Sequence, residues 1–219
     1  MAESRSRALL LCGVIAGPLF LVAVALEGVS RADYDPVRHP ISSLALGPFG
    51  WTQTANFIVA GVLSLAFATG ARTALKPGRG RLWAPILVYA WGIGLIGSGV
   101  FVTDPVSGYP PGTPAKLAEP TTIGTLHDLF ALPVFLGFPV LCLVLLARFL
   151  SERQFGWAAY TLLTAIAFTT FFLLASAGFE QDASLVDFAG LLQRITIAIA
   201  WLWLTLLALR LRSELIDAR

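Results

Sequence analysis

Residues 31–53 read RADYDPVRHPISSLALGPFGWTQ and lead from one long apolar run, residues 8–26, into another, residues 51–71. The stretch carries two aspartates, two arginines, two adjacent serines and one of the two histidines of the chain. A few turn residues would suffice to join two helices, and ionisable groups beside membrane spans usually have a function. We therefore interpret residues 31–53 as the main wall of an outward-facing polar site.

The composition indicates an integral membrane protein. Hydrophobic residues make up 57% of the 219 residues and charged residues 13%, with a mean hydropathy of +0.78. This charge content is roughly half that of an average soluble domain. The net charge is only +2, and there is no basic run with interleaved aromatic residues, so nucleic acid is excluded as a partner.

The apolar runs predict the fold class. A helix needs about 20 apolar residues to cross a hydrocarbon layer of about 30 Å. No run alternates with the period of a strand, and lipid cannot satisfy open backbone groups, so each run is expected to be helical. Six runs qualify: residues 8–26, 51–71, 82–102, 123–147, 156–177 and 189–209. The chain is therefore predicted to be one all-α membrane domain, residues 1–219, built as a bundle of six transmembrane helices.

Prolines refine this prediction. Pro40, as a first helical residue before ISSLAL, predicts a short interfacial helix that lies against the membrane surface after the first span. Prolines within the spans predict kinks, because proline lacks the backbone N–H that a helix interior needs. These prolines are Pro18, Pro85, Pro133 and Pro139.

Lysine and arginine predict the orientation. If the N-terminus is cytoplasmic, four of the 15 basic residues lie on the outer side, namely Arg31, Arg38, Lys116 and Arg194. The positive-inside rule then favours a multi-pass protein of the cell membrane with both termini in the cytoplasm. Most of the 13 acidic residues and both histidines share the outer side. Acidic residues hardly influence insertion, so this clustering indicates an outer polar site.

The candidates for catalysis are the acid–base side chains near the outer ends of the spans: His39, His127, Asp128 and Asp104. His127 and Asp128 open the fourth span and point about 100° apart on a helix, so only one of them is expected to face the bundle. Asp104 ends the third span, because the proline after it disfavours helix.

Other polar residues of the outer side are expected to line a ligand pocket. They are Asp33, Asp35, Arg38, Ser42, Ser43, Gln53, Asn56, Asp187 and Arg194. Asp187 and Arg194 are seven positions apart at the start of the last span. Two helical turns would place them on one face, where they could form an ion pair.

Four segments resemble a known family. The segments DYDPVRHPISSLALGPFGWTQTANFIVAG, TDP, GTLHDLFALPVFLGFP and GLLQRITIAIAWLWL, in this order, are similar to the bacterial six-span membrane family catalogued as domain of unknown function 998. The resemblance covers the chain from the first span to the sixth. It implies a six-helix membrane fold and brings no activity with it.

Three hypotheses about function remain open at this point. In the first, the outer His/Asp/Arg pocket binds a lipid or another amphiphilic ligand without chemistry. In the second, the protein is a membrane-embedded hydrolase or transferase that acts on lipid esters or amides. His39, His127 and Asp104 would then hold a zinc-type divalent metal ion, which would acidify a bound water. This resembles the intramembrane ceramidase and receptor-type hydrolases, although those use three histidines and this chain has two.

The third hypothesis is a metal-free isoprenoid cyclase or isomerase, in which a carboxylic acid of raised pKa in an apolar cavity protonates the substrate. The sequence leaves open whether the protein is an enzyme, and the absence of any cofactor is as compatible with it as a metal. The bilayer is the one expected partner besides such a ligand, and the oligomeric state is open.

Overall fold

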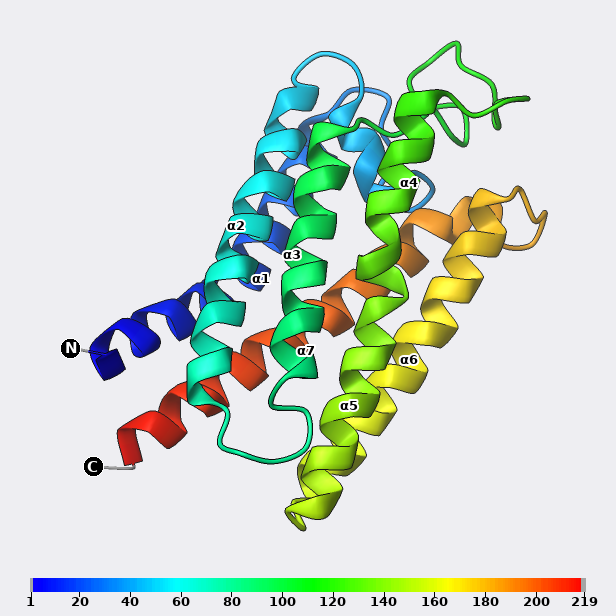
Figure 1. The fold of residues 1–219 in the computed structure, drawn as a ribbon. Helices are drawn as coiled ribbons and strands as arrows, with labels where there is room; N and C mark the ends of the chain where they lie inside the picture. The colour runs from blue at the N-terminus through cyan, green and yellow to red at the C-terminus, as the bar shows by residue number, and fades with distance from the viewer. Residues whose placement is uncertain (1, 218–219) are drawn as a thin grey trace.

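The computed structural model describes residues 2–217, and this part of the chain is helical with no named strand (Figure 1). Its elements are α1 (Ala2–Ser30), η1 (Ile41–Ala45), α2 (Gly50–Ala74), α3 (Trp83–Val100), α4 (Thr122–Phe135), α5 (Gly137–Ser151), α6 (Phe155–Phe179), η2 (Val186–Phe188) and α7 (Ala189–Asp217). Within the described residues, six helical segments are long and apolar enough to cross a membrane, and α4 with α5 counts as one of them. The predicted six-span helical bundle is confirmed.

The six spans form a closed ring. α2 packs between α1 and α3, α4 and α5 pack on α3, α6 packs on α5, and α7 packs on both α6 and α1. Large aromatic side chains fill the centre, among them the fully buried Trp91, Trp201 and Trp203. The chain termini lie at one end of the bundle, which we call the terminal end (Figure 1). The loops 31–49, 101–121 and 180–188 lie at the other end, which we call the His39 end.

Glycines bring the second and third spans close together. A Cβ atom on Gly61 would lie 2.7 Å from the carbonyl oxygen of Gly92, and one on Gly92 would lie 2.9 Å from the carbonyl oxygen of Gly61. In lipid, helices associate through close van der Waals contact, so small residues at a crossing are stabilising. This contact fixes α3, which carries several residues of the site described below.

The fourth span is two helices rather than the single helix expected for residues 123–147. α4 ends at Phe135 and α5 begins at Gly137, with Leu136 between them. Pro133 and Pro139 lie on either side of this break, and neither can donate a backbone hydrogen bond. The predicted kink is present here, whereas α1 and α3 continue past Pro18 and Pro85.

The helical turn expected after Pro40 is present, but its surroundings differ from the prediction. It is a 3₁₀-helix, η1, whose Ile41, Ser43 and Leu44 side chains are almost completely covered by protein. η1 packs against α1, α2 and α7. The Gln193 side-chain oxygen on α7 accepts a hydrogen bond of 2.8 Å from the backbone N–H of Ile41. η1 is thus inserted into the mouth of the bundle instead of resting on its surface.

Candidate functional site

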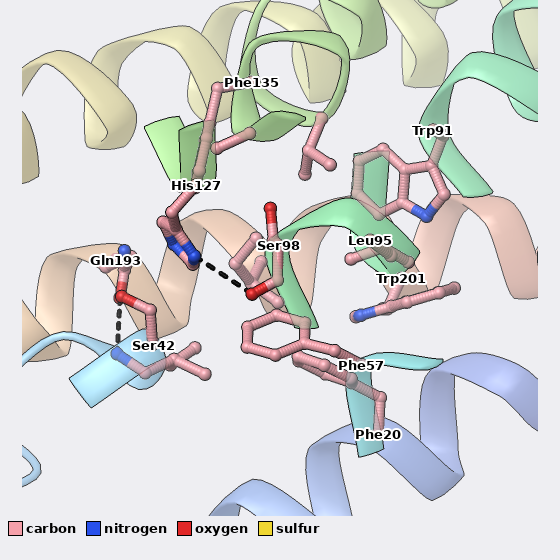
Figure 2. Close-up of a pocket in the computed structure, with 14 residues that line it drawn as sticks. Phe20, Ser42, Phe57, Trp91, Leu95, Ser98, His127, Phe135, Gln193 and Trp201 are labelled. Atoms are coloured by element: carbon pink, nitrogen blue, oxygen red, sulfur yellow. Dashed lines mark hydrogen bonds between the residues drawn. The ribbon is translucent and has the colours of Figure 1, made fainter. Parts of the chain in front are cut away.

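A central cavity of about 50 Å³ lies directly beneath η1 (Figure 2). Aromatic and aliphatic side chains make up most of its wall. The lining residues are Phe20, Ile41, Ser42, Phe57, Trp91, Leu95, Ser98, His127, Ala131, Val134, Phe135, Gln193, Ile197 and Trp201. The described lining contains no aspartate, glutamate, lysine or arginine, so the cavity is apolar with a few uncharged polar groups.

His127 is the polar group whose geometry is best defined. Its Nδ1 atom lies 2.8 Å from the carbonyl oxygen of Phe101 and 3.0 Å from that of Ser98. Because both partners are acceptors, Nδ1 carries the proton, and Nε2 is left as a hydrogen-bond acceptor. The two carbonyls belong to the last turn and the end of α3, where backbone acceptors lack helical partners. His127 therefore joins α4 to α3 and keeps one free nitrogen at the cavity.

A lateral groove of about 230 Å³ adjoins this cavity. It is formed by α4, α6 and α7, and Figure 1 shows that α4 and α6 diverge towards the His39 end. The groove and the cavity share three lining residues, Ala131, Phe135 and Gln193. Asp128 lines the groove and not the cavity. His127 and Asp128 thus line different spaces, as expected for adjacent residues that point about 100° apart on a helix.

Asp128 also bears on the acid–base hypothesis. That hypothesis needs a carboxylic acid in the apolar cavity, and the described lining of the cavity contains none. The nearest candidate by sequence, Asp128, belongs to the lateral groove. An acid–base reaction of this kind would therefore need the substrate to react in the groove rather than in the cavity.

His39 lies outside the cavity, in an aromatic cluster at the His39 end. The centre of its ring is 5.5 Å from that of Tyr34 and 5.1 Å from that of Tyr109. Its Nδ1 atom accepts a hydrogen bond of 2.9 Å from the backbone N–H of Asp35. Burial lowers the pKa of His39, against the opposing effects of Asp35 and of a backbone hydrogen bond with Ser107. The neutral imidazole thus ties the loop 31–49 to the loop 101–121.

Arg194 holds the same loop from α7. Its guanidinium donates to the backbone oxygen of His39 at 2.9 Å and to the hydroxyl of Tyr34. The Tyr34 hydroxyl in turn donates to the backbone oxygen of Pro40 at 2.9 Å. Burial raises the pKa of Tyr34, although Arg194 opposes this shift. Tyr34 and Arg194 therefore anchor the residues that precede η1.

The expected pairing of Asp187 with Arg194 is wrong. Asp187 forms an ion pair of 2.7 Å with Arg38. It lies in η2, and α7 begins only at Ala189, so the spacing of two helical turns does not apply. Asp187 and Arg38 connect the loop 180–188 to the loop 31–49, at an exposed position.

Asp104 binds the residue that caps the start of α4. Its carboxylate accepts hydrogen bonds from the backbone N–H of Thr121 at 2.8 Å and from the Thr121 hydroxyl at 2.6 Å. A Cβ atom on Gly124 would collide with this carboxylate. Thr121 itself accepts from the N–H of Gly124, as an N-cap residue does. Asp104 therefore supports the cap of α4.

The proposed metal ligands are not brought together. Over residues 2–217, no group of three or more histidines, cysteines, aspartates and glutamates could hold a metal ion. His39, His127 and Asp104 each bind a different part of the backbone, as described above. The expected zinc-type site of these three residues is therefore corrected to three separate structural contacts, and the metal-dependent hypothesis loses its ligand set.

The serines and amides of the predicted pocket divide between the cavity and the core. Ser42 lines the cavity, whereas Ser43 is fully buried in η1. The Asn56 amide donates to the Gln53 side-chain oxygen at 3.1 Å and to the backbone oxygen of Phe20 at 3.3 Å. Gln53 and Asn56 therefore join α2 to α1 and do not line the cavity.

The two aspartates of the loop 31–49 also lie away from the cavity. Asp35 accepts a hydrogen bond of 2.8 Å from the backbone N–H of Val37. Asp33 has a positive φ of 59° and lines a separate hollow at the His39 end, together with Arg31. Of the residues predicted for the site, the structure thus places Ser42 and His127 at the cavity and Asp128 at the adjoining groove.

Comparison with known families decides the identity of the fold. A family model described as Protein of unknown function (DUF998) matches residues 14–210. The chain belongs to this family. No curated protein and no solved structure matches it. The match runs from α1 to α7, so the predicted resemblance is confirmed and the DUF998 fold is a six-span helical bundle in this chain.

Several wall residues of this DUF998 chain were not predicted. Gln193 lies beside Arg194 in GLLQRIT and is a polar residue in an apolar span, which was the available signal. Ser98 lies within a glycine-rich segment of α3, and small residues in a transmembrane helix usually serve helix packing. Trp201 lies in an apolar span, where a tryptophan usually packs in the core or against lipid. Only the structure shows that Trp201 and Trp91 meet at a cavity, with ring centres 5.3 Å apart.

Proposed function

We propose that this DUF998 protein binds an amphiphilic ligand, whose apolar chain occupies the lateral groove and whose head occupies the central cavity. The observation that carries the proposal is that groove and cavity share Ala131, Phe135 and Gln193. A ligand dissolved in the bilayer could then enter sideways between α4 and α6. The proposal assigns binding to the site and leaves it without chemistry.

The shape of the two hollows supports a ligand with a chain. The groove is larger than the cavity, about 230 Å³ against about 50 Å³. Apolar side chains such as Leu132, Phe172 and Phe179 form most of the groove. The polar groups Ser42, Ser98 and His127 gather in the cavity. A mostly apolar entrance and an apolar cavity with a few uncharged polar groups together suit a molecule that has a long apolar part and a small polar end.

We also propose that the His39 end faces outward and that both termini are cytoplasmic. The support is the excess of arginine and lysine towards the terminal end. Arg72 and Arg81 line an open hollow there, and Arg148 binds the backbone oxygens of Lys76 and Arg79. The cavity then lies nearer to the outer leaflet, which would supply the ligand.

Photolabelling tests the site directly. The purified protein in lipid nanodiscs is incubated with a fatty-acyl amphiphile that carries a diazirine in its chain, irradiated, and mapped by peptide mass spectrometry. We expect labels on groove residues such as Leu132 and Phe172 in excess of lipid-facing residues such as Leu143. An even distribution over the lipid-facing surface would contradict the proposal.

A pair of matched variants separates groove binding from contact with bulk lipid. Ala131→Phe places a ring where groove and cavity meet and should reduce labelling of the cavity residue Ile197. Leu163→Phe is the control, because Leu163 is 65% exposed on α6 and lines neither hollow. Equal labelling of Ile197 in both variants would contradict entry through the groove.

A further inference from the structure

The central cavity contains polar hydrogens that have no partner within the protein. Trp91, Trp201 and Ser98 line the cavity. The indole Nε1 atoms of the two tryptophans and the hydroxyl of Ser98 form no hydrogen bond with any described residue. These three side chains are 1%, 2% and 4% exposed, respectively. Leaving a buried donor unpaired costs about 1–3 kcal/mol, so this arrangement indicates a ligand with an acceptor.

The type of acceptor follows from the chemistry of the donors. An indole N–H can donate but cannot accept, so two of the three groups select oxygen atoms with free lone pairs. Figure 2 shows Trp91, Trp201 and Ser98 around the same pocket. The nitrogen of Trp201 lies at the end of its ring that faces Ser98, whereas the nitrogen of Trp91 lies on the side of its ring that is turned towards Trp201. A single oxygen atom has two lone pairs and can accept from Trp201 and Ser98 together.

The cavity also selects against charge. No lysine or arginine belongs to the described lining, so an anionic head would have no counter-ion there. No aspartate or glutamate belongs to it either, so a cationic head is equally disfavoured. An isolated charge in an apolar site costs far more free energy than an uncharged polar group. The head that fits is therefore neutral.

The volume limits the size of the head. A cavity of about 50 Å³ is roughly a third of the ~150 Å³ engineered cavity that binds benzene. A six-membered ring is therefore too large for it, which excludes quinone and sterol rings. A carbonyl group with its neighbouring atoms is small enough.

We infer that the ligand of this cavity is an uncharged acyl ester or amide, whose carbonyl oxygen accepts hydrogen bonds from the indole of Trp201 and from the hydroxyl of Ser98. The inference rests on the proposed function, since it names the ligand class of the same site. His127 Nε2, the acceptor described above, can in addition receive an N–H or O–H of the same head. The acyl chain extends past Ala131 into the groove.

Competition in the photolabelling assay tests this inference. Three unlabelled molecules with an eighteen-carbon chain are added in turn: methyl oleate, the oleate anion at alkaline pH, and 1-octadecene. We expect methyl oleate to displace the label from Ile197, and the anion and the alkene to do so at least about tenfold less well. Equal displacement by all three would overturn the ligand class while leaving the amphiphile site intact. Displacement by none of them, with even labelling, would overturn the proposed function itself.

Variants that remove one donor but keep the ring give a second test. Trp201→Phe should weaken competition by methyl oleate by about three- to tenfold, the usual range for one neutral hydrogen bond. Trp157→Phe is the control, because Trp157 does not line the cavity. Unchanged competition in Trp201→Phe would contradict the assigned indole hydrogen bond.

A measurement on the unmodified protein covers the case in which a variant does not fold. Ultraviolet resonance Raman spectra report hydrogen bonding of indole N–H groups. Addition of methyl oleate should produce a difference signal for a newly bonded indole, and 1-octadecene should not. Identical spectra with both molecules would contradict the inference.

Discussion

The imidazole Nδ1 atom of His127 on α4 lies 2.8 Å from the carbonyl oxygen of Phe101, the C-cap residue of α3. This contact determines the tautomer of His127 and leaves Nε2 at the cavity. It also satisfies a backbone acceptor that would otherwise have no partner at the end of a transmembrane helix. One side chain therefore serves both the packing of two helices and the polarity of the site.

Replacement of His127 should separate these two roles. In His127→Asn the amide can still donate to the carbonyl of Phe101, whereas His127→Phe cannot donate at all. We expect the phenylalanine variant to lose roughly 1 kcal/mol more stability than the asparagine variant. Thermal unfolding of both proteins in the same detergent measures the difference. Equal unfolding temperatures would show that the contact is not stabilising.

Arg194 should be more important for stability than the exposed Arg38. Arg194 binds the backbone of His39 and the hydroxyl of Tyr34, whereas Arg38 pairs with Asp187 near the surface. Arg194→Gln should cost about 1–3 kcal/mol and Arg38→Gln at most about 0.5 kcal/mol. Chemical unfolding in detergent measures both values. A larger loss for Arg38→Gln would contradict the loop anchor described here.

The stability of the protein should decrease as the pH decreases, because His39 then becomes protonated. Burial holds the pKa of His39 below its ordinary value, so the unfolded chain binds a proton at a higher pH than the folded protein does. The contribution of His39 to the free energy of unfolding is therefore fully present above the unfolded pKa of about 6.5. It is lost as the pH falls below that value. The neutral ring is needed because Nδ1 accepts from the N–H of Asp35.

Unfolding temperatures between pH 7.5 and pH 5.5 measure this loss, and His39→Gln is the control. The variant cannot titrate at this position, so its stability should depend less on pH in this window. A steeper pH dependence in His39→Gln than in the wild type would reverse the assigned sign.

Membrane topology can be tested with single cysteines. In a background in which Cys12 and Cys142 are replaced by alanine, Lys116→Cys should react with an impermeant maleimide added to intact cells. Lys76→Cys should react only after the membrane is opened. Labelling of both variants in intact cells, or the reverse pattern, would contradict an outward-facing His39 end.

The spans followed from the sequence because their signal is local: a run of about 20 apolar residues is helical in lipid wherever it lies. A kink beside Leu136 was predicted from the two prolines there, whereas the break into two helices was not. The site was harder to predict, because it depends on contacts between distant segments. Asp187 illustrates this difficulty, since its partner Arg38 is 149 positions away and the nearer Arg194 binds elsewhere.

The polar residues of the loop 31–49 suggested an outward-facing polar site, but in the structure most of them form internal contacts. His39, for example, bonds to the backbone of its own loop. The cavity instead uses uncharged groups from separate spans, such as Ser98 and Gln193. Tryptophans in an apolar span indicate packing by default, so the unpaired indoles of Trp91 and Trp201 could be found only from the three-dimensional arrangement.

Fluorescence quenching tests most directly whether an amphiphile reaches the centre of the bundle. Trp91 and Trp201 are almost completely buried, so bulk lipid chains cannot contact them. A methyl ester with a brominated acyl chain should quench their emission in the wild type, and Ala131→Phe should suppress that part of the quenching while Leu163→Phe preserves it. If the wild type and Ala131→Phe show the same quenching, and loss of both indoles in Trp91→Phe/Trp201→Phe leaves it unchanged, no ligand enters the cavity.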